Sequence, residues 1–334
     1  MKALRFDAFG DPSEVLRVVD LPTPEPGPGE IRVKMIASPI NPSDILTIRG
    51  KYGTLPDLPF TPGYEGVGVV DRAGPGLIGK LLMGRRVAVL SQAGGNWAQY
   101  TVIPALRVVP VPNDLPDDQV ASFFVNPATA LAMTRHVLAV PKGAWLLQSA
   151  AGSTLGRMII KLGKHDGFKT INVVRRPEAM DELKRIGADA VICPADGPIG
   201  DQVRRVVGQG GVQYAIDPVA GETGTGMFDA LGENGRMLVY GTLEYKPIEV
   251  DPRRMIAGKR VLEGFYLGFW STGRPKWKMV VLFRQISELI RMGVLASEPG
   301  RHFAIDDFQE GVRQAEQSGR LGKGLIMLGD PGSK

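Results

Sequence analysis

Cysteine and histidine are scarce in this chain of 334 residues, which holds one cysteine and three histidines. The single thiol, Cys193, excludes an intrachain disulfide and any cysteine-rich zinc site. The histidines His136, His165 and His302 are far apart in the sequence and are not clustered with carboxylates. Because a catalytic zinc needs several such ligands together, the sequence predicts that no metal is bound.

Long hydrophobic runs and a strong excess of charge are missing as well. No apolar segment reaches the length that crosses a bilayer, and the first residues carry no signal-like hydrophobic stretch. A net charge of +5 is only mildly basic and does not by itself indicate nucleic-acid binding. We therefore expect a cytoplasmic protein that binds small molecules, with no membrane and no nucleic acid among its partners.

The composition and the hydrophobic pattern of the sequence change along the chain. Residues 1–118 are rich in Gly and Pro and hold short apolar runs, which predicts a β-rich, partly barrelled domain. Strands and helices then alternate up to residue 267, as in a doubly wound parallel sheet with helices on both faces. The segment from residue 268 to the C-terminus can fold back and join the first domain. We predict an α/β protein with a parallel-sheet domain at 119–267 and a second domain made of 1–118 and 268–334.

Residues 145–156 are typical of a strand, a tight turn and the start of a helix. Ala150, Ser153 and Gly156 follow the spacing of an A-x-x-G-x-x-G variant of a dinucleotide-binding turn. Small side chains let the backbone approach a diphosphate, and the helix N-terminus offers free N–H groups. The turn residues expected to contact a dinucleotide are Ala151, Gly152, Ser153, Thr154, Leu155 and Gly156.

Arg175 and Arg176 follow the next predicted strand, at residues 170–174. They come roughly 20 residues after the turn, where a dinucleotide-binding fold places the residue that contacts the adenosine ribose. An acidic residue there would accept a hydrogen bond from the 2′-hydroxyl of NAD, whereas arginines suit a 2′-phosphate. The pair predicts NADP(H), and the alternative is a solvated basic turn.

Several short motifs resemble those of the medium-chain dehydrogenase/reductase superfamily over essentially the whole chain. They lie at residues 41–44, 62–68, 85–87 and 126–130 and at Gly221. The resemblance implies a Rossmann domain joined to a GroES-like catalytic domain. In zinc-dependent members a cysteine precedes the Asp of the first motif and a histidine stands in place of Tyr64, and both are missing here.

Within the zinc-free branch, the chain is most similar to the trans-2-enoyl-CoA/ACP (2-enoyl thioester) reductases. The likeness rests on residues 41–56, 170–175 and 264–270. Quinone oxidoreductases share the Asn-Pro-x-Asp motif but usually lack the tyrosine loop. One departure is Thr154, which stands where these reductases usually have glycine.

The resemblance implies NADPH as the cofactor and assigns roles to individual residues. Tyr52 would donate a proton or orient the substrate carbonyl. Asn41 would position Tyr52 or the cofactor carboxamide, or it is a turn residue before proline. Trp270 would bond to Tyr52 or line the acyl pocket, or it packs in the core. Further cofactor contacts are implied for Thr129, Tyr240, Gly241, Thr242, Phe265 and Leu267.

The activity that follows is NADPH-dependent reduction of the carbon–carbon double bond of trans-2-enoyl thioesters or related enones. The hydride goes to the β-carbon and the proton to the α-carbon. The alternatives are an NADPH:quinone oxidoreductase and a non-catalytic NADPH-binding protein.

Further expected partners are an acyl carrier protein and a second copy of the chain, through the edge strand at 261–266. Seven basic residues could hold the phosphates of coenzyme A or an acidic carrier: Arg253, Arg254, Lys259, Arg260, Arg274, Lys276 and Lys278.

Overall fold

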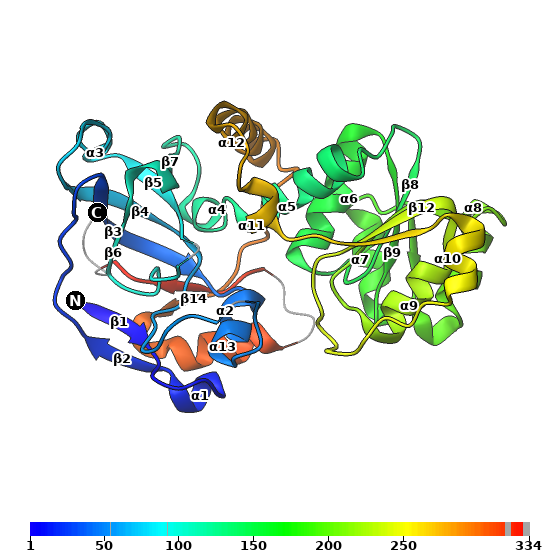
Figure 1. Cartoon of the computed structure of the whole chain (residues 1–334), viewed down its shortest axis with the longest axis horizontal. Coiled ribbons are helices and arrows are strands. Elements are labelled where there is room, and N and C mark those ends of the chain that lie inside the picture. Colours follow the sequence, from blue (N-terminus) through cyan, green and yellow to red (C-terminus); the bar gives the residue numbers. More distant parts are fainter. Residues whose placement is uncertain (54, 92, 318–321, 330–334) are drawn as a thin grey trace. The chain divides into compact units, whose positions relative to one another are not determined.

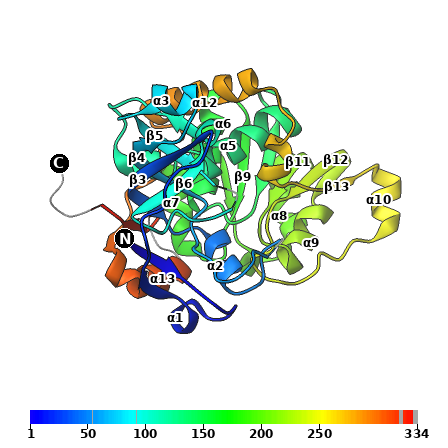
Figure 2. The same ribbon diagram turned by 60° about the vertical axis from the view of Figure 1, so that its left-hand side comes forward.

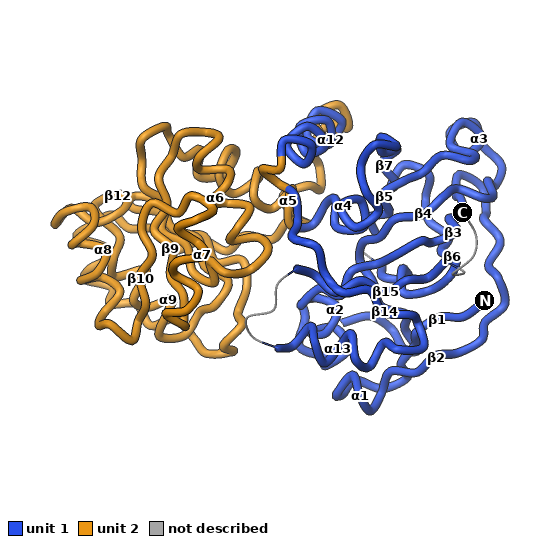
Figure 3. Tube along the Cα trace, turned by 180° about the vertical axis from the view of Figure 1, so that it is seen from behind, with its two compact units in different colours: residues 1–125, 280–292, 296–334 blue, residues 126–279, 293–295 orange. Residues whose placement is uncertain are grey.

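The computed structural model describes residues 1–53, 55–91, 93–317 and 322–329, which form two compact units (Figure 3). Unit 1 contains residues 1–125, 280–292 and 296–334, and unit 2 contains residues 126–279 and 293–295. These bounds differ from the domain limits expected from the sequence. The backbone N–H groups of Phe124 and Val125 donate to Glu65 of unit 1, and Trp270 stacks near His136 of unit 2. The assignment of a catalytic and a cofactor-binding role to the two domains stays a prediction.

Unit 2 is built on a sheet of strands (Figures 1 and 2). The sheet is parallel and has the strand order β10-β9-β8-β11-β12-β13. Because the order reverses beside β8 and parallel crossovers are right-handed, the helices of the two halves lie on opposite faces. The doubly wound parallel sheet expected from the sequence is therefore confirmed. The strands are β8 (Trp145–Gln148), β9 (Lys169–Val173), β10 (Ala190–Ile192), β11 (Val212–Asp217), β12 (Leu231–Val239) and β13 (Val261–Gly264).

Helices connect these strands and cover the sheet. In α6 the buried Ile160 belongs to a hydrophobic cluster with Val174, and a Cβ on Gly163 would lie 3.1 Å from the Thr170 side chain of β9, so this face of the helix packs on the sheet. The helical segments are α5 (Val125–Leu131), η2, a π-helix (Ala132–Val137), α6 (Thr154–Asp166), η3 (Pro177–Ala179), α7 (Met180–Arg185), η4 (Pro194–Asp196), α8 (Ile199–Val207), α9 (Gly221–Asp229), α10 (Pro252–Gly258) and α11 (Leu267–Ser271). Strand β13 ends the sheet order, so the predicted pairing of this strand with its copy in a homodimer stays a prediction.

Unit 1 is organised around the long strand β3 (Glu30–Pro39), whose residues alternate between buried and partly exposed over most of its length. Strand β4 (Glu65–Ala73) pairs along one edge of β3, while β6 (Tyr100–Pro104) and β15 (Leu325–Met327) share the other edge. Ile326 of β15 lies opposite Ser38 of β3. Strand β15, near the C-terminus, therefore lies in the same sheet as β3.

The other strands of unit 1 extend this sheet or form the small β1-β2 sheet. They are β1 (Lys2–Arg5), β2 (Arg17–Asp20), β5 (Arg86–Leu90), β7 (Val108–Pro110) and β14 (His302–Ala304). The helices are α1 (Pro12–Val15), α2 (Pro42–Ile48), α3 (Leu77–Leu82), η1 (Ala105–Arg107), α4 (Asp117–Ala121), α12 (Lys276–Arg291), η5 (Ile305–Asp307) and α13 (Phe308–Glu316). Helix α12 begins in unit 2 and continues in unit 1. Of the helices that the described residues form, none has the length and hydrophobicity needed to cross a membrane.

Candidate active site

The carboxyl ends of β8 and β11 meet where the strand order of unit 2 reverses, which is where doubly wound folds bind their ligands. Two buried side chains join the strand ends, because the Ser149 hydroxyl donates to the Asp217 carboxylate. Asp217 also accepts from the backbone N–H groups of Val219 (2.9 Å) and Ala220 (2.8 Å). Burial raises the pKa of Asp217. Sequence reasoning missed this pair, whose members are 68 residues apart.

The turn after β8 has the geometry of a dinucleotide-binding turn. Ala150 adopts a positive φ of 48°, and Ser153 is the N-cap of α6, with its hydroxyl accepting from the Gly156 N–H at 3.1 Å. Helix α6 therefore begins at Thr154. A Cβ on Gly156 would lie 2.6 Å from the Ala151 carbonyl oxygen, so close packing of strand and helix requires glycine.

A buried glutamine holds this turn against the neighbouring strand. The Gln148 Nε2 donates to the Gly156 carbonyl at 3.0 Å and to Asn172 Oδ1 at 2.7 Å. Asn172 Nδ2 in turn donates to the Ala190 carbonyl of β10 at 2.9 Å. The amides of Gln148 and Asn172 therefore connect strands β8, β9 and β10 to the start of α6. No periodic pattern in the sequence predicted these contacts.

Arg175 and Arg176 are both exposed and follow the end of β9. Arg175 lines a hollow of about 950 Å³ together with residues at the start of α8 and α9, such as Ile199 and Gly221, whereas Arg176 does not line it. The structure therefore separates the two arginines that the sequence treated as a pair. Arg175 is the one placed beside a space that could hold the adenosine end of a dinucleotide.

The other predicted cofactor contacts follow strands β12 and β13 or lie on helices of unit 2. Gly241 follows β12 with Tyr240 and Thr242 beside it, and a Cβ at Gly241 would lie 2.9 Å from the Pro218 carbonyl oxygen. This close approach explains the glycine. Thr129 lies in α5, Phe265 follows β13 and donates its N–H to Val239, and Leu267 is the first residue of α11.

In unit 1, Asn41 is the N-cap of α2 and is only 3% exposed. Its Oδ1 accepts from the buried Lys323 ammonium at 2.6 Å, and its Nδ2 donates to Glu65 Oε1 at 3.1 Å. Glu65 is 1% exposed and also accepts from the Val125 N–H at 2.9 Å. Both ends of the Asn41 amide are therefore engaged inside unit 1. Sequence reasoning found Asn41 but missed Glu65 and Lys323 as its partners.

Tyr52 lies in the loop after α2, with its ring 5.9 Å from the ring of Tyr64. The hydroxyls of Tyr64 and Thr47 are 2.7 Å apart, and Thr47 donates to the Ser43 carbonyl, so the Tyr64 hydroxyl is the donor between them. The fully buried Asp44 accepts from the Asn41 N–H, and burial raises its pKa to about 7. The arrangement places two phenols and a buried carboxyl on and around one short helix.

Trp270 lies in α11 of unit 2, where its ring is 5.6 Å from the His136 ring and 3.9 Å from the Arg274 guanidinium carbon. Its buried Nε1 has no hydrogen-bond partner among the described residues. Burial, followed by the charge of Arg274, lowers the pKa of His136. Strand β13 ends at Gly264, and Trp270 follows it on α11.

In the described part of the chain, side chains that could bind a metal ion are not clustered. Within residues 1–53, 55–91, 93–317 and 322–329, no group of three His, Cys, Asp or Glu side chains could hold a metal ion. The position that carries a histidine ligand in zinc-dependent members of the resembled superfamily holds the phenol of Tyr64, bonded to Thr47.

Comparison with known proteins identifies relatives along the whole chain. Residues 27–113 match the family model of the alcohol dehydrogenase GroES-like domain, and residues 154–282 match that of the zinc-binding dehydrogenases. The mitochondrial enoyl-[acyl-carrier-protein] reductase of Xenopus tropicalis is 30% identical over 322 residues, which covers 94% of this chain and 92% of the relative.

Solved structures agree with this kinship. A mycobacterial quinone oxidoreductase superimposes with a TM-score of 0.85 at 27% identity, covering 98% of this chain and 99% of the other. The protein Etr1p in complex with NADP and crotonyl-CoA superimposes with a TM-score of 0.84 at 26% identity, with the same coverage. The chain belongs to the medium-chain dehydrogenase/reductase superfamily of oxidoreductases, in the group that contains the enoyl reductases and the quinone oxidoreductases.

Proposed function

We propose that this protein uses NADPH to reduce the carbon–carbon double bond of trans-2-enoyl thioesters. The observation that carries the proposal is the pair of phenols, Tyr52 and Tyr64, whose rings lie 5.9 Å apart beside α2. Reduction of an enoyl thioester needs a proton donor, and a protonated phenol can supply one at neutral pH. Kinship with an enoyl-[acyl-carrier-protein] reductase over nearly the whole chain supports the same activity.

Unit 2 has features that fit NADPH. A Cβ on Gly152 would meet no atom within 4 Å, so the turn is open where a diphosphate would approach, and α6 begins directly after it. Arg175 beside the hollow supplies a guanidinium that can pair with a 2′-phosphate. The solved Etr1p complex with NADP supports this cofactor. When bound, NADPH supplies the hydride.

The residues of unit 1 handle the proton in this proposal. Tyr52 donates to the α-carbon of the substrate or holds the thioester oxygen as negative charge develops there. Tyr64 donates to Thr47, which fixes its ring beside Tyr52. Since both ends of the Asn41 amide bond to Glu65 and Lys323, Asn41 anchors the start of α2 instead of contacting the cofactor carboxamide.

A substrate panel with NADPH tests the proposal. Steady-state rates are measured with crotonyl-CoA, a small uncharged enone and a series of benzoquinones. We expect turnover of crotonyl-CoA with kcat/KM well above that of any quinone. Higher kcat/KM for the quinones would replace the proposal with a quinone oxidoreductase, and tight NADPH binding without turnover of any compound would identify a non-catalytic NADPH-binding protein.

A further inference from the structure

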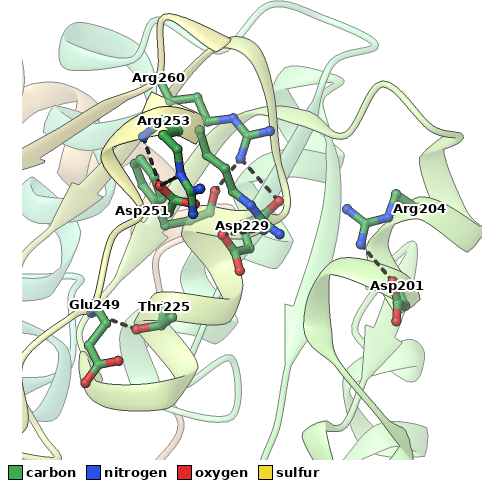
Figure 4. A network of polar contacts seen from close by, with 10 residues as sticks. Asp201, Arg204, Thr225, Asp229, Glu249, Asp251, Arg253 and Arg260 are labelled. Carbon is green, nitrogen blue, oxygen red and sulfur yellow. Dashed lines mark hydrogen bonds and ion pairs between the residues drawn. The ribbon is translucent and has the colours of Figure 1, made fainter. Parts of the chain in front are cut away.

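Six of the seven basic residues near the end of unit 2 fall into two groups with different surroundings. In the first group, Arg253 pairs with Asp251 at 3.0 Å and Arg254 pairs with Asp229 at 2.8 Å. Arg260 donates to the carbonyl oxygens of Phe228 and Asp229, each at 3.4 Å (Figure 4). Arg253 and Arg254 therefore already have carboxylate partners, whereas Arg260 donates only to carbonyl oxygens and its buried Nε has no partner among the described residues.

The second group is Arg274, Lys276 and Lys278, and it differs in having no counter-charge. Residues 264–287 contain no Asp or Glu, and no carboxylate in the described part of the chain lies within ion-pair distance of these three side chains. Lys276 and Lys278 are exposed. They lie in the first turn of α12, where the helix dipole disfavours positive charge. An anion bound here would relieve that repulsion.

Aromatic rings accompany these cations. The Lys278 ammonium lies 5.4 Å from the ring centroid of Trp277, whose side chain is 64% exposed. The Arg274 Nε donates to the Trp270 carbonyl at 2.9 Å, and its guanidinium carbon is 3.9 Å from that ring. The guanidinium is therefore held in one orientation by a hydrogen bond and a ring face. Arg274, Lys276, Trp277 and Lys278 are called the basic turn below.

We propose that the basic turn binds the phosphorylated adenosine end of coenzyme A, with the cations on its phosphates and the exposed face of Trp277 against adenine. This inference rests on the proposed function, because it names the carrier to which the enoyl group is attached. Ammonium and guanidinium groups suit phosphate, and every purine has a flat face that stacks on an indole. An acidic carrier protein would use the same cations but would not need an exposed indole ring.

Direct binding tests the site without turnover. Adenosine 3′,5′-bisphosphate is titrated calorimetrically into protein saturated with NADP⁺, so that the dinucleotide site is already filled. We expect binding that weakens as salt rises, and we expect Lys278→Glu and Trp277→Ala each to raise Kd roughly tenfold, which is a change of about 1.4 kcal/mol. The matched controls are Arg205→Glu, at an exposed arginine of α8, and Ile256→Ala, at an apolar side chain of α10 that is 77% exposed. Absence of binding, or equal effects of test and control variants, would overturn the proposal.

Kinetics with matched substrates gives a second measurement. Crotonyl-CoA carries the adenosine phosphates and crotonyl-pantetheine lacks them. Lys278→Glu should raise KM for crotonyl-CoA roughly tenfold and leave kcat and the KM for crotonyl-pantetheine unchanged. An equal rise for both substrates, or a rise confined to an acyl carrier protein substrate, would contradict it. If neither thioester is reduced, the proposed function fails, while the calorimetric result still decides whether the site exists.

Discussion

At the level of single residues, the chemistry depends on one phenol. If Tyr52 donates a proton or a hydrogen bond to the reacting thioester, Tyr52→Phe removes that interaction while keeping the ring against Tyr64. General acid catalysis typically contributes ~10²–10⁴-fold, so we expect kcat and kcat/KM to fall together by about that factor. Stopped-flow and steady-state rates with crotonyl-CoA measure the fall, and NADPH affinity should not change. Full activity of the variant would show that Tyr52 only packs against its neighbours and has no catalytic role.

Cofactor choice is also a single-residue question, because only one of two adjacent arginines lines the hollow. Arg175→Ala should weaken NADPH binding roughly tenfold or more and leave NADH nearly unaffected, since only NADPH carries the 2′-phosphate. Arg176→Ala is the matched control, with the same loss of charge at an exposed neighbour. Fluorescence titration of both cofactors separates the variants. Equal losses for NADPH and NADH would place Arg175 away from the phosphate.

Asp44 gives a prediction about pH. Burial raises its pKa from 3.8 to about 7 in the folded protein, so between these values the folded state binds more protons at this group than the unfolded state. Its contribution to stability is therefore present below about pH 4 and is lost as pH rises towards 7. Chemical denaturation across this range should show that the stability difference, wild type minus Asp44→Asn, falls with rising pH. A difference independent of pH would show that Asp44 is ionised throughout.

At the level of elements, the packing of the first turn of α6 against the backbone of Ala151 decides whether the turn after β8 can form. A Cβ at Gly156 would lie 2.6 Å from a backbone carbonyl oxygen, while one at Gly152, in the same turn, would meet nothing within 4 Å. Overpacking against the backbone typically costs about 1–3 kcal/mol, so Gly156→Ala should lower the unfolding free energy by that amount and weaken NADPH binding. Gly152→Ala is the control and should leave stability nearly unchanged. Urea denaturation compares the two.

Hydrogen bonds between side chains then fix this turn relative to its neighbours. Ser149 joins β8 to β11 through Asp217, and Gln148 joins β8 to β9 through Asn172. Buried polar groups of this kind are costly unless paired, so each pair favours one arrangement of the strand ends. The edge of the sheet that faces the dinucleotide in our proposal is thus held by polar contacts as well as by packing.

For the whole molecule, we expect activity without a metal ion. The chain has one cysteine and three histidines, and the position of a zinc ligand in zinc-dependent relatives is occupied by Tyr64. Prolonged dialysis against a chelator should leave the rate of NADPH oxidation with crotonyl-CoA unchanged. Elemental analysis of the same samples is the control. Stoichiometric zinc together with loss of activity on its removal would contradict this expectation.

Local patterns in the sequence were enough to predict much of the fold. The alternation of short apolar runs with helical periods indicated the parallel sheet of unit 2, and the spacing of small residues at 150–156 indicated the turn after β8. These features could be predicted because each depends on residues within about one strand or helix of one another. Residues 118–138 indicate a helix that is interrupted or entered near Asn126-Pro127, and in the structure α4 ends at Ala121 and α5 begins at Val125. Buried contacts of Glu65 with the N–H groups of residues 124 and 125 favour that break.

Only the tertiary structure decided which polar residues meet. Asn41, Glu65 and Lys323 come from distant parts of the sequence, and no periodicity connects them, because their contact depends on the path of the chain through β3, β4 and β15. The same holds for the seven basic residues, which look alike in the sequence. The fold gives Arg253 and Arg254 carboxylate partners and leaves Lys278 without one in the described part of the chain. Charge type is a property of the sequence, whereas the electrostatic surroundings of each charge depend on which distant residues the fold brings near it.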